Sequence, residues 1–70
     1  MGYIMIMDAK ELKRWRARQG LSQAKLAAEL GVHVMTISKW EQGQRRIPPF
    51  LGLALEALKR KLEGQRRAGA

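Results

Sequence analysis

Residues 31–43, GVHVMTISKWEQG, contain the pattern on which the fold depends. Gly31 and Gly43 bracket a segment, 34–42, whose spacing predicts a helix. At about 100° per residue, Ile37 and Trp40 share one face, and Glu41 falls between them and Val34. The opposite face carries Met35, Lys39 and Gln42, with Thr36 and Ser38 on the flanks. The segment therefore predicts an amphipathic helix whose apolar face holds one carboxylate and whose first turn begins with apolar side chains.

A second short helix is predicted directly before it, over residues 23–30. Ser22 is a good N-cap, although Lys25 stands where a capping box needs Glu or Gln. The inner face consists of Leu26, Ala27 and Leu30. Gly31 suits the left-handed turn between the two helices, and the small Ala27 lets them cross closely. Two short helices joined around a glycine form a helix-turn-helix pattern, which by itself is a weak signal.

The N-terminal part of the chain predicts one more helix, over residues 9–18. Asp8 is its N-cap and Gly20 its stop. Leu12, Trp15 and Arg16 fall on one side of this helix, and its other basic residues, Lys10, Lys13, Arg14 and Arg18, fall on the opposite side. The apolar stripe of this helix therefore also contains one charge, that of Arg16.

A fourth and longer helix is predicted from near Pro49 to about Leu62, after a basic loop at 44–48. Its stripe consists of Leu51, Leu55, Leu58 and Leu62, and further apolar residues extend it, namely Phe50, Leu53, Ala54 and Ala57. That surplus exceeds what one side of a small core covers, so part of it is expected to face a partner.

Gly and Pro lie between the predicted helices, apart from Gly52. The expected organisation is an apolar arm at 1–7, one domain at 8–63 and a flexible basic tail at 64–70.

Composition limits the classes of function. Seventy residues allow one small domain, and fourteen Lys and Arg against six Asp and Glu favour a polyanionic partner. With no cysteine and one histidine, no thiolate or imidazole metal cluster is expected, and no cofactor. Scattered acids and the absence of a glycine-rich phosphate loop argue against an enzyme. The apolar run Tyr3–Met7 is too short to span a membrane or to form a signal peptide, so a cytoplasmic location is expected.

The combination of residues is more specific than any of its parts. The segment ELKRWRARQGLSQAKLAAELGVHVMTISKWEQGQRRIP resembles the phage repressor and Cro (XRE-type) helix-turn-helix DNA-binding family. The features that carry the resemblance are Leu12, Arg16, Gly20-Leu21-Ser22-Gln23, Leu26-Ala27, Gly31-Val32, Thr36-Ile37-Ser38, Trp40-Glu41, Gly43 and Ile47-Pro48. The resemblance covers about residues 9–55 and implies an all-α, compact four-helix, lambda-repressor-like domain. The long C-terminal helix departs from relatives that have two short ones, which leaves the geometry of a dimer open.

Arg16 and Glu41 are the two charges that face inward. The simplest hypothesis is that they form an ion pair tying helix 9–18 to helix 34–42, and the same pair recurs in the family that the chain resembles. The alternative is two separate side chains, each reaching solvent along its own aliphatic stem.

The resemblance also implies which residues touch DNA. The N-terminal part of helix 34–42 would enter the major groove, with Val34, Met35, Thr36 and Lys39 facing base edges. Lys39 can donate to guanine, whereas Val34 and Met35 offer apolar surface that suits the thymine methyl group. Partial burial in the core is the alternative for Val34. Backbone contacts would fall to Ser22, Gln23, His33, Ser38, Arg45 and Arg46. His33 stands where the family has Ser or Thr as N-cap, and an ordinary exposed helix start is the alternative for Gln23.

The expected function is a transcription regulator, most simply a repressor that occupies an operator on double-stranded DNA as a homodimer. An alternative is an antitoxin that keeps the DNA-binding fold and binds a partner toxin through the apolar arm or helix 49–62. A third is an RNA or membrane-surface binder that uses charge alone.

The run Tyr3–Met7 has three possible roles: a strand pairing across a dimer, a cover over helix 9–18 or helix 49–62, or a disordered end.

Overall fold

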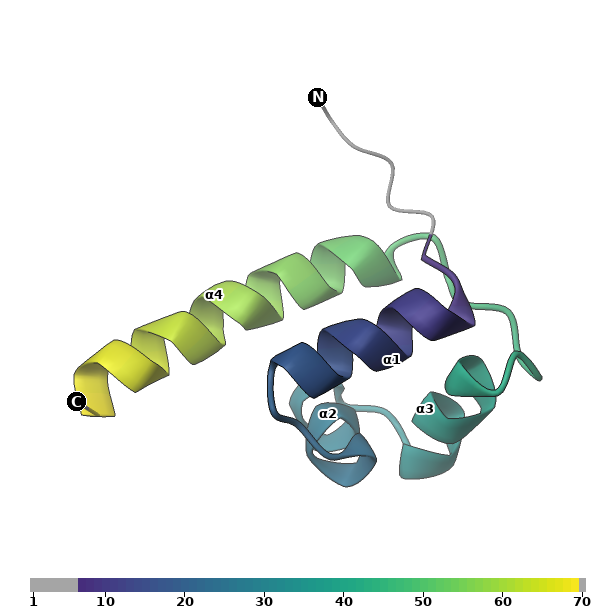
Figure 1. Ribbon diagram of the computed structural model, residues 1–70, viewed down its shortest axis with the longest axis horizontal. Coiled ribbons are helices and arrows are strands. Elements are labelled where there is room, and N and C mark those ends of the chain that lie inside the picture. Colours follow the sequence, from purple (N-terminus) through teal and green to yellow (C-terminus); the bar gives the residue numbers. More distant parts are fainter. Residues whose placement is uncertain (1–6, 70) are drawn as a thin grey trace.

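The computed structural model describes residues 7–69, with side chains as far as Gln65, and is all-α. Its helices are α1 (Ala9–Arg18), α2 (Gln23–Leu30), α3 (Val34–Glu41) and α4 (Leu51–Gly69). No strand occurs within 7–69. The four-helix, all-α prediction is therefore confirmed. In the view of Figure 1, α4 runs along one edge of the molecule, α1 lies in front, and α2 and α3 lie farther back toward the opposite edge. Of the predicted arm, only Met7 lies among the described residues, and it packs against the core.

Hydrogen-bonding side chains begin the first two helices. The Asp8 carboxylate accepts from the Glu11 backbone N–H at 2.8 Å, and the Glu11 carboxylate accepts from the Asp8 N–H at 3.1 Å. This reciprocal capping box satisfies two N–H groups that the helix itself cannot pair. At α2, the Ser22 hydroxyl accepts from the Lys25 N–H at 3.0 Å. Sequence therefore places both helix starts, through the residue types at their N-caps.

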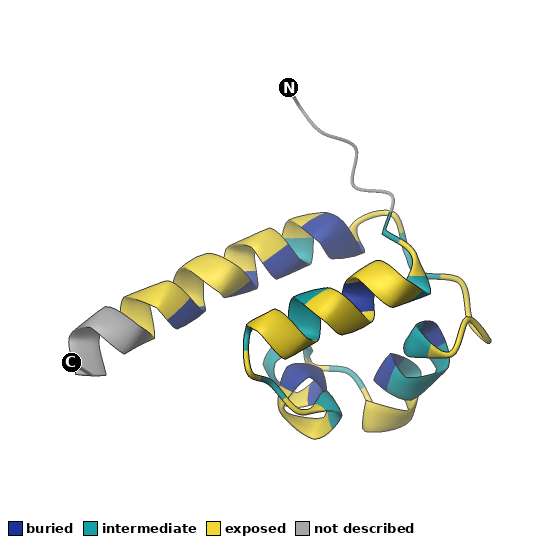
Figure 2. Cartoon of the chain, in the orientation of Figure 1, coloured by how far each residue is buried: buried dark blue, intermediate teal, exposed yellow. Residues whose placement is uncertain are grey.

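The core is one cluster to which every helix contributes. Its buried members are Leu12, Leu26, Ala27, Ile37, Trp40, Leu51, Leu55, Leu58 and Leu62. These are the residues that helical periodicity placed on the inner faces, and Figure 2 marks the buried positions in dark blue on all four helices. Trp15 and Leu30, also predicted to face inward, are partly buried against the cluster. The apolar patterning thus predicts the packing of all four helices.

The bounds of α4 differ from the prediction. The helix begins at Leu51, after a turn at 49–50, rather than near Pro49. It also continues to Gly69 instead of ending near Leu62, so that Gly64 lies inside a helix. A glycine inside a helix costs only about 1 kcal/mol relative to alanine, and the surrounding Glu, Gln, Arg and Ala residues favour helix. The predicted end at Leu62 is wrong because the end of an apolar stripe marks the end of the buried face, whereas the helical backbone continues beyond it.

A surface contact links α4 to α2. Lys61 Nζ donates to Glu29 Oε1 at 3.0 Å, and Lys25 lies 3.6 Å from the other Glu29 oxygen. The hydrogen bond from Lys61 is the main reason that the pKa of Glu29 lies below its ordinary value.

None of the helices within residues 7–69 has both the length and the apolar character that a membrane crossing requires.

Candidate nucleic-acid interface

The turn between α2 and α3 sets the position of the second helix. Gly31 ends α2 with a φ of 74°, in the left-handed region where a Cβ is disfavoured. The Val32 N–H then donates to the Ala27 carbonyl at 3.0 Å, which closes the end of α2. Ala27 itself is buried, and its small side chain allows the close approach of α3 that the sequence predicted. The result is a closely packed helix-turn-helix unit.

Arg16 and Glu41 join α1 to this unit. Arg16 Nε donates to Glu41 Oε2 at 2.6 Å, and a terminal nitrogen of the same guanidinium donates to Glu41 Oε1 at 3.0 Å. The other terminal nitrogen donates to the Leu21 carbonyl at 2.9 Å. The ion pair expected from the sequence is therefore present, in the bidentate geometry that favours Arg over Lys.

Gln23 extends the pair into a cluster that spans three helices. Its side-chain amide donates to Glu41 Oε1 at 3.0 Å. Side-chain exposure is 16% for Arg16 and 4% for Glu41, so the charges are largely withdrawn from water. Burial alone raises the pKa of the Glu41 carboxyl, but hydrogen bonds from Arg16 and Gln23, together with the positive charges of Arg16 and Lys13, outweigh it, and the pKa lies below its ordinary value. The bond to Glu41 likewise raises the pKa of Arg16. Both groups are therefore held in their charged forms.

The exposed side of α3 begins with apolar side chains. Ile37 and Trp40 are buried in the core, whereas Val34 is 38% and Met35 is 55% exposed. Thr36 and Lys39 are half-buried on the same helix. At 38% exposure, most of the Val34 side chain is covered while part of it reaches the surface, so both groove contact and partial burial in the core remain open for this residue. The four side chains predicted to face bases thus all reach the surface of α3, with the two apolar ones in its first turn.

The six residues predicted to touch phosphates lie in different surroundings. Ser22, His33, Arg45 and Arg46 are exposed, and Gln23 and Ser38 are half-buried. The Ser38 hydroxyl accepts from the Gln42 side-chain amide at 2.8 Å. His33 is the N-cap of α3 and makes no side-chain capping bond, in line with its poor capping chemistry. The loop that carries the two arginines folds onto the end of α3, where the Gln44 and Arg45 N–H groups donate to the Lys39 carbonyl at 2.9 and 3.3 Å.

A family model described as helix-turn-helix (HTH_3) matches residues 12–58. This chain belongs to the XRE-type helix-turn-helix family. The matched span starts and ends at buried leucines, Leu12 and Leu58, and it includes every buried core residue except Leu62. It makes the protein a DNA-binding transcription regulator of this type and double-stranded DNA its partner. A search of curated proteins finds no match to the chain.

Sequence reasoning missed three contacts that position the interface. The Arg16 contact with the Leu21 carbonyl could not be foreseen, because a backbone acceptor leaves no trace in residue type. The Gln23 contact with Glu41 depends on how α2 and α3 cross. The Asp8–Glu11 capping box, by contrast, had a signal in the sequence, since Asp followed three residues later by Glu has the spacing of that motif.

Proposed function

We propose that the protein is a sequence-specific repressor that occupies an operator as a homodimer, with residues 33–42 in the major groove. The observation that carries this proposal is the exposure of Val34 and Met35 on the first turn of α3, while Ile37 and Trp40 anchor the same helix in the core. Apolar side chains held out at the start of a helix-turn-helix recognition helix suit the groove, where thymine methyl groups offer apolar contact.

Base recognition is assigned to Val34, Met35, Thr36 and Lys39. Met35 is the most exposed of the apolar pair and points away from the core, so a thymine methyl is its natural counterpart. Lys39 can donate to O6 and N7 of guanine, and the Thr36 hydroxyl or methyl can contact a neighbouring base. The expected code is a thymine-containing step at Met35 beside a guanine at Lys39.

Phosphate binding is assigned to Ser22, Gln23, His33, Ser38, Arg45 and Arg46. Ser22 and Gln23 open α2, where helix N–H groups and the helix dipole favour an anion. The bond from Gln23 to Glu41 uses one of the two hydrogens on its amide nitrogen, so the side chain is held in place and retains a second donor. Arg45 and Arg46 supply exposed positive charge in the next loop. These contacts give most of the affinity and should weaken steeply with salt.

Repression would follow from occupancy of the operator, which excludes polymerase from the same DNA. A two-fold dimer would bind two half-sites roughly 34 Å apart, about one turn of the duplex. An antitoxin would use the same α3 surface for DNA and would differ in its protein partner. A repressor and an antitoxin would therefore recognise DNA in the same way and would differ in the protein that binds the chain.

Selection from a random duplex library tests the recognition step. The full chain is expected to enrich a defined half-site containing a T step and a G, arranged as an inverted repeat. A selected pool with no motif, or one that competes no better than bulk duplex, would contradict sequence-specific binding. A single unrepeated half-site would contradict the homodimer.

A further inference from the structure

Three cations follow the outer side of α1 at intervals of four residues. Lys10, Arg14 and Arg18 are exposed, and among the described residues none of the three forms an ion pair. Glu11, the one acid of α1, accepts from the Asp8 N–H. Like charges four residues apart weaken a helix, and Lys10 also stands in the first turn, where the helix dipole disfavours a cation. The helix therefore loses some stability by carrying these three residues, which we call the α1 basic stripe.

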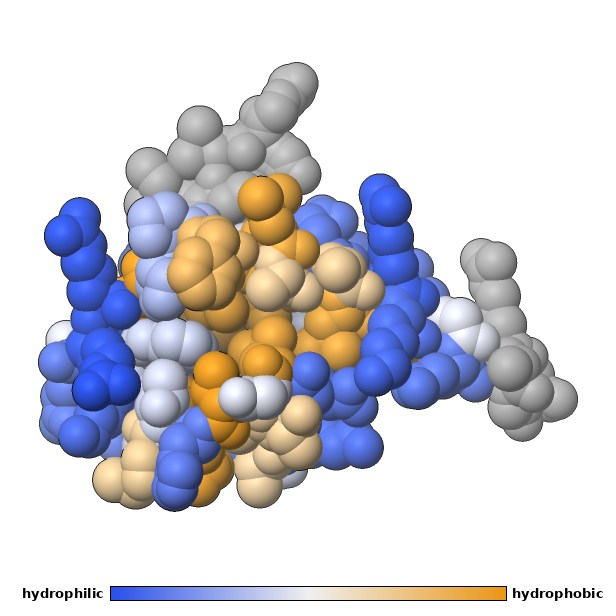
Figure 3. Space-filling view, turned by 180° about the vertical axis from the view of Figure 1, so that it is seen from behind, coloured by the Kyte–Doolittle hydropathy of each residue, from blue (hydrophilic) through white to orange (hydrophobic). Residues whose placement is uncertain are grey.

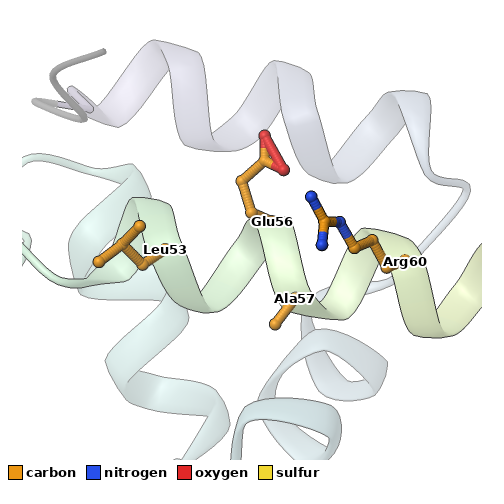
Figure 4. Close-up of a pocket in the computed structure, with 4 residues that line it drawn as sticks. All are labelled: Leu53, Glu56, Ala57 and Arg60. Carbon is orange, nitrogen blue, oxygen red and sulfur yellow. The ribbon is translucent and has the colours of Figure 1, made fainter. Parts of the chain in front are cut away.

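The surface of α4 is different in kind. Lys61 donates to Glu29 on α2, and Arg60 follows Glu56 by one turn at a hollow of about 420 Å³ (Figure 4). Leu53, part of the apolar surplus predicted to face a partner, is 66% exposed at the same hollow. From behind, apolar side chains gather near the middle of the molecule with hydrophilic ones on either side (Figure 3). Because α1 lies in front in Figure 1, its basic stripe is separate from this apolar side.

The stripe points away from the helix assigned to base recognition. Lys10 and Arg14 stand two residues before and after the fully buried Leu12, so at about 100° per residue both lie nearly opposite the core side of α1. Met35 stands in the same relation to the fully buried Ile37 of α3. An ion pair joins the inner sides of α1 and α3, so their outer sides face apart. A duplex bound to α3 is therefore not expected to reach the stripe.

The composition of this side of α1 fits phosphate groups better than a protein surface. Protein interfaces have an apolar centre from which Lys is depleted, and the one exposed apolar residue of α1 is Ala17. Four residues of helix rise about 6 Å, so the three cations span about 12 Å. Each strand of a duplex carries a phosphate about every 3.4 Å along its axis, which offers an acceptor to every cation of the stripe.

We propose that Lys10, Arg14 and Arg18 form a second, sequence-independent binding surface for duplex DNA, which holds one segment while α3 holds another. The ligand is the phosphate backbone, because the stripe consists of charged donors and is not placed to enter a groove with α3. Double-stranded DNA is already the partner of the chain, so a second segment of the same DNA is the polyanion closest at hand. One bound copy would thus bridge two segments. The proposal extends the proposed function and rests on α3 holding the first duplex.

Binding at the stripe should be weak and strongly dependent on salt. Three phosphate contacts correspond to a slope of about −2.7 in log affinity against log salt. Attachment of the protein to one segment raises the effective concentration of a second segment on the same DNA. Bridging should therefore be clearest at low salt and on long DNA.

A two-duplex capture assay tests the surface. The full chain saturates a duplex fixed to beads, and a labelled duplex of unrelated sequence is then added at low salt. The wild type should retain the labelled duplex, and Lys10→Gln/Arg14→Gln should retain at least fivefold less. Lys59→Gln/Arg60→Gln removes two charges from exposed positions on α4 and should behave as wild type. The melting temperature of Lys10→Gln/Arg14→Gln should be unchanged or higher, because repulsion between like charges is removed.

Four results would overturn the proposal. The first is no capture by the wild type, or equal loss in the two variants, which is also what bridging through two α3 helices of a dimer would give. The second is weaker binding of the bead-bound duplex by Lys10→Gln/Arg14→Gln alone, which would put the stripe on the same duplex as α3. The third is stronger retention of labelled polyglutamate than of duplex, which would indicate an acidic protein partner. The fourth is a lower melting temperature for Lys10→Gln/Arg14→Gln, which would indicate a structural role.

The capture result is separable from the test of the proposed function. Any duplex that the chain saturates can be fixed to the beads, and both variants leave α3 intact. A selection without a motif would contradict sequence-specific repression, whereas the comparison of the two variants would still decide whether the stripe binds DNA.

Discussion

The guanidinium of Arg16 and the carboxylate of Glu41 meet through two hydrogen bonds of 2.6 and 3.0 Å, joining residues that are 25 positions apart in the chain. A largely buried ion pair contributes little beyond what apolar residues would, but loss of one partner leaves a charge without compensation. This asymmetry gives the first prediction. Glu41→Leu alone should destabilise the fold by about 3 kcal/mol, whereas Arg16→Met/Glu41→Leu should recover most of that loss. Thermal unfolding measures both, and simple addition of the two single effects would count against a coupled pair.

The pH dependence of stability should change with the same carboxylate. The pKa of Glu41 in the folded chain lies below its ordinary value of 4.5, so the unfolded chain takes up this proton first as pH falls. The stabilisation from Glu41 is therefore present above about pH 4.5 and is lost as pH falls through the lower, folded pKa. Unfolding free energies of Glu41→Gln and the wild type, measured from neutral to acidic pH, should converge at low pH. A constant difference across this range would exclude the linkage.

Lys39 should determine a base preference, and the two loop arginines should not. Lys39→Ala is expected to relax preference at one base pair, with a loss of about 1–3 kcal/mol of discrimination. Arg45→Ala and Arg46→Ala should weaken binding to all duplexes alike, each reducing the slope of log affinity against log salt by about 1. Titration of a small set of duplexes at several salt concentrations separates the two effects. An unchanged rank order of duplexes for Lys39→Ala would remove it from the base-contacting set.

His33 should show opposite effects on stability and on binding. As the N-cap of α3 it makes no side-chain capping bond, so His33→Ser should stabilise the fold by about 0.5–1 kcal/mol. If His33 contacts a phosphate, as proposed, the same change should weaken DNA binding. Chemical denaturation and duplex titration of one protein preparation measure the two quantities. Tighter DNA binding by His33→Ser would mean that this histidine acts only as an imperfect cap.

Glycine replacements should differ in sign between Gly31 and Gly64. A Cβ at either position meets open space, so the backbone decides the outcome. Gly31 has a φ of 74°, and Gly31→Ala should destabilise the fold by about 1–2 kcal/mol. Gly64 lies inside α4, and Gly64→Ala should stabilise that helix by about 0.5–1 kcal/mol. Denaturant midpoints compare them directly, and destabilisation by Gly64→Ala would contradict the helical end of α4.

The sequence by itself determined the helix starts, the turn between α2 and α3 and the inward face of each helix, through local chemistry and periodicity. Asp8 and Ser22 mark helix starts because their side chains cap free N–H groups, and Gly31 marks a turn because glycine readily adopts the positive φ found there. The inward faces were also predictable, since an apolar stripe at helical spacing has only one stable side to bury. The residues of α3 assigned to DNA follow from the same stripe together with the family resemblance.

Only the tertiary structure decided how those faces meet. That Gln23 also donates to Glu41, beside Arg16, depends on how α2 and α3 cross, which no local pattern encodes. The exposure of Leu53, four residues before an exposed Ala57, likewise follows from how much of α4 the small core can cover. Periodicity predicts which side of a helix is apolar, whereas the amount of partner surface available decides which apolar residues stay in water.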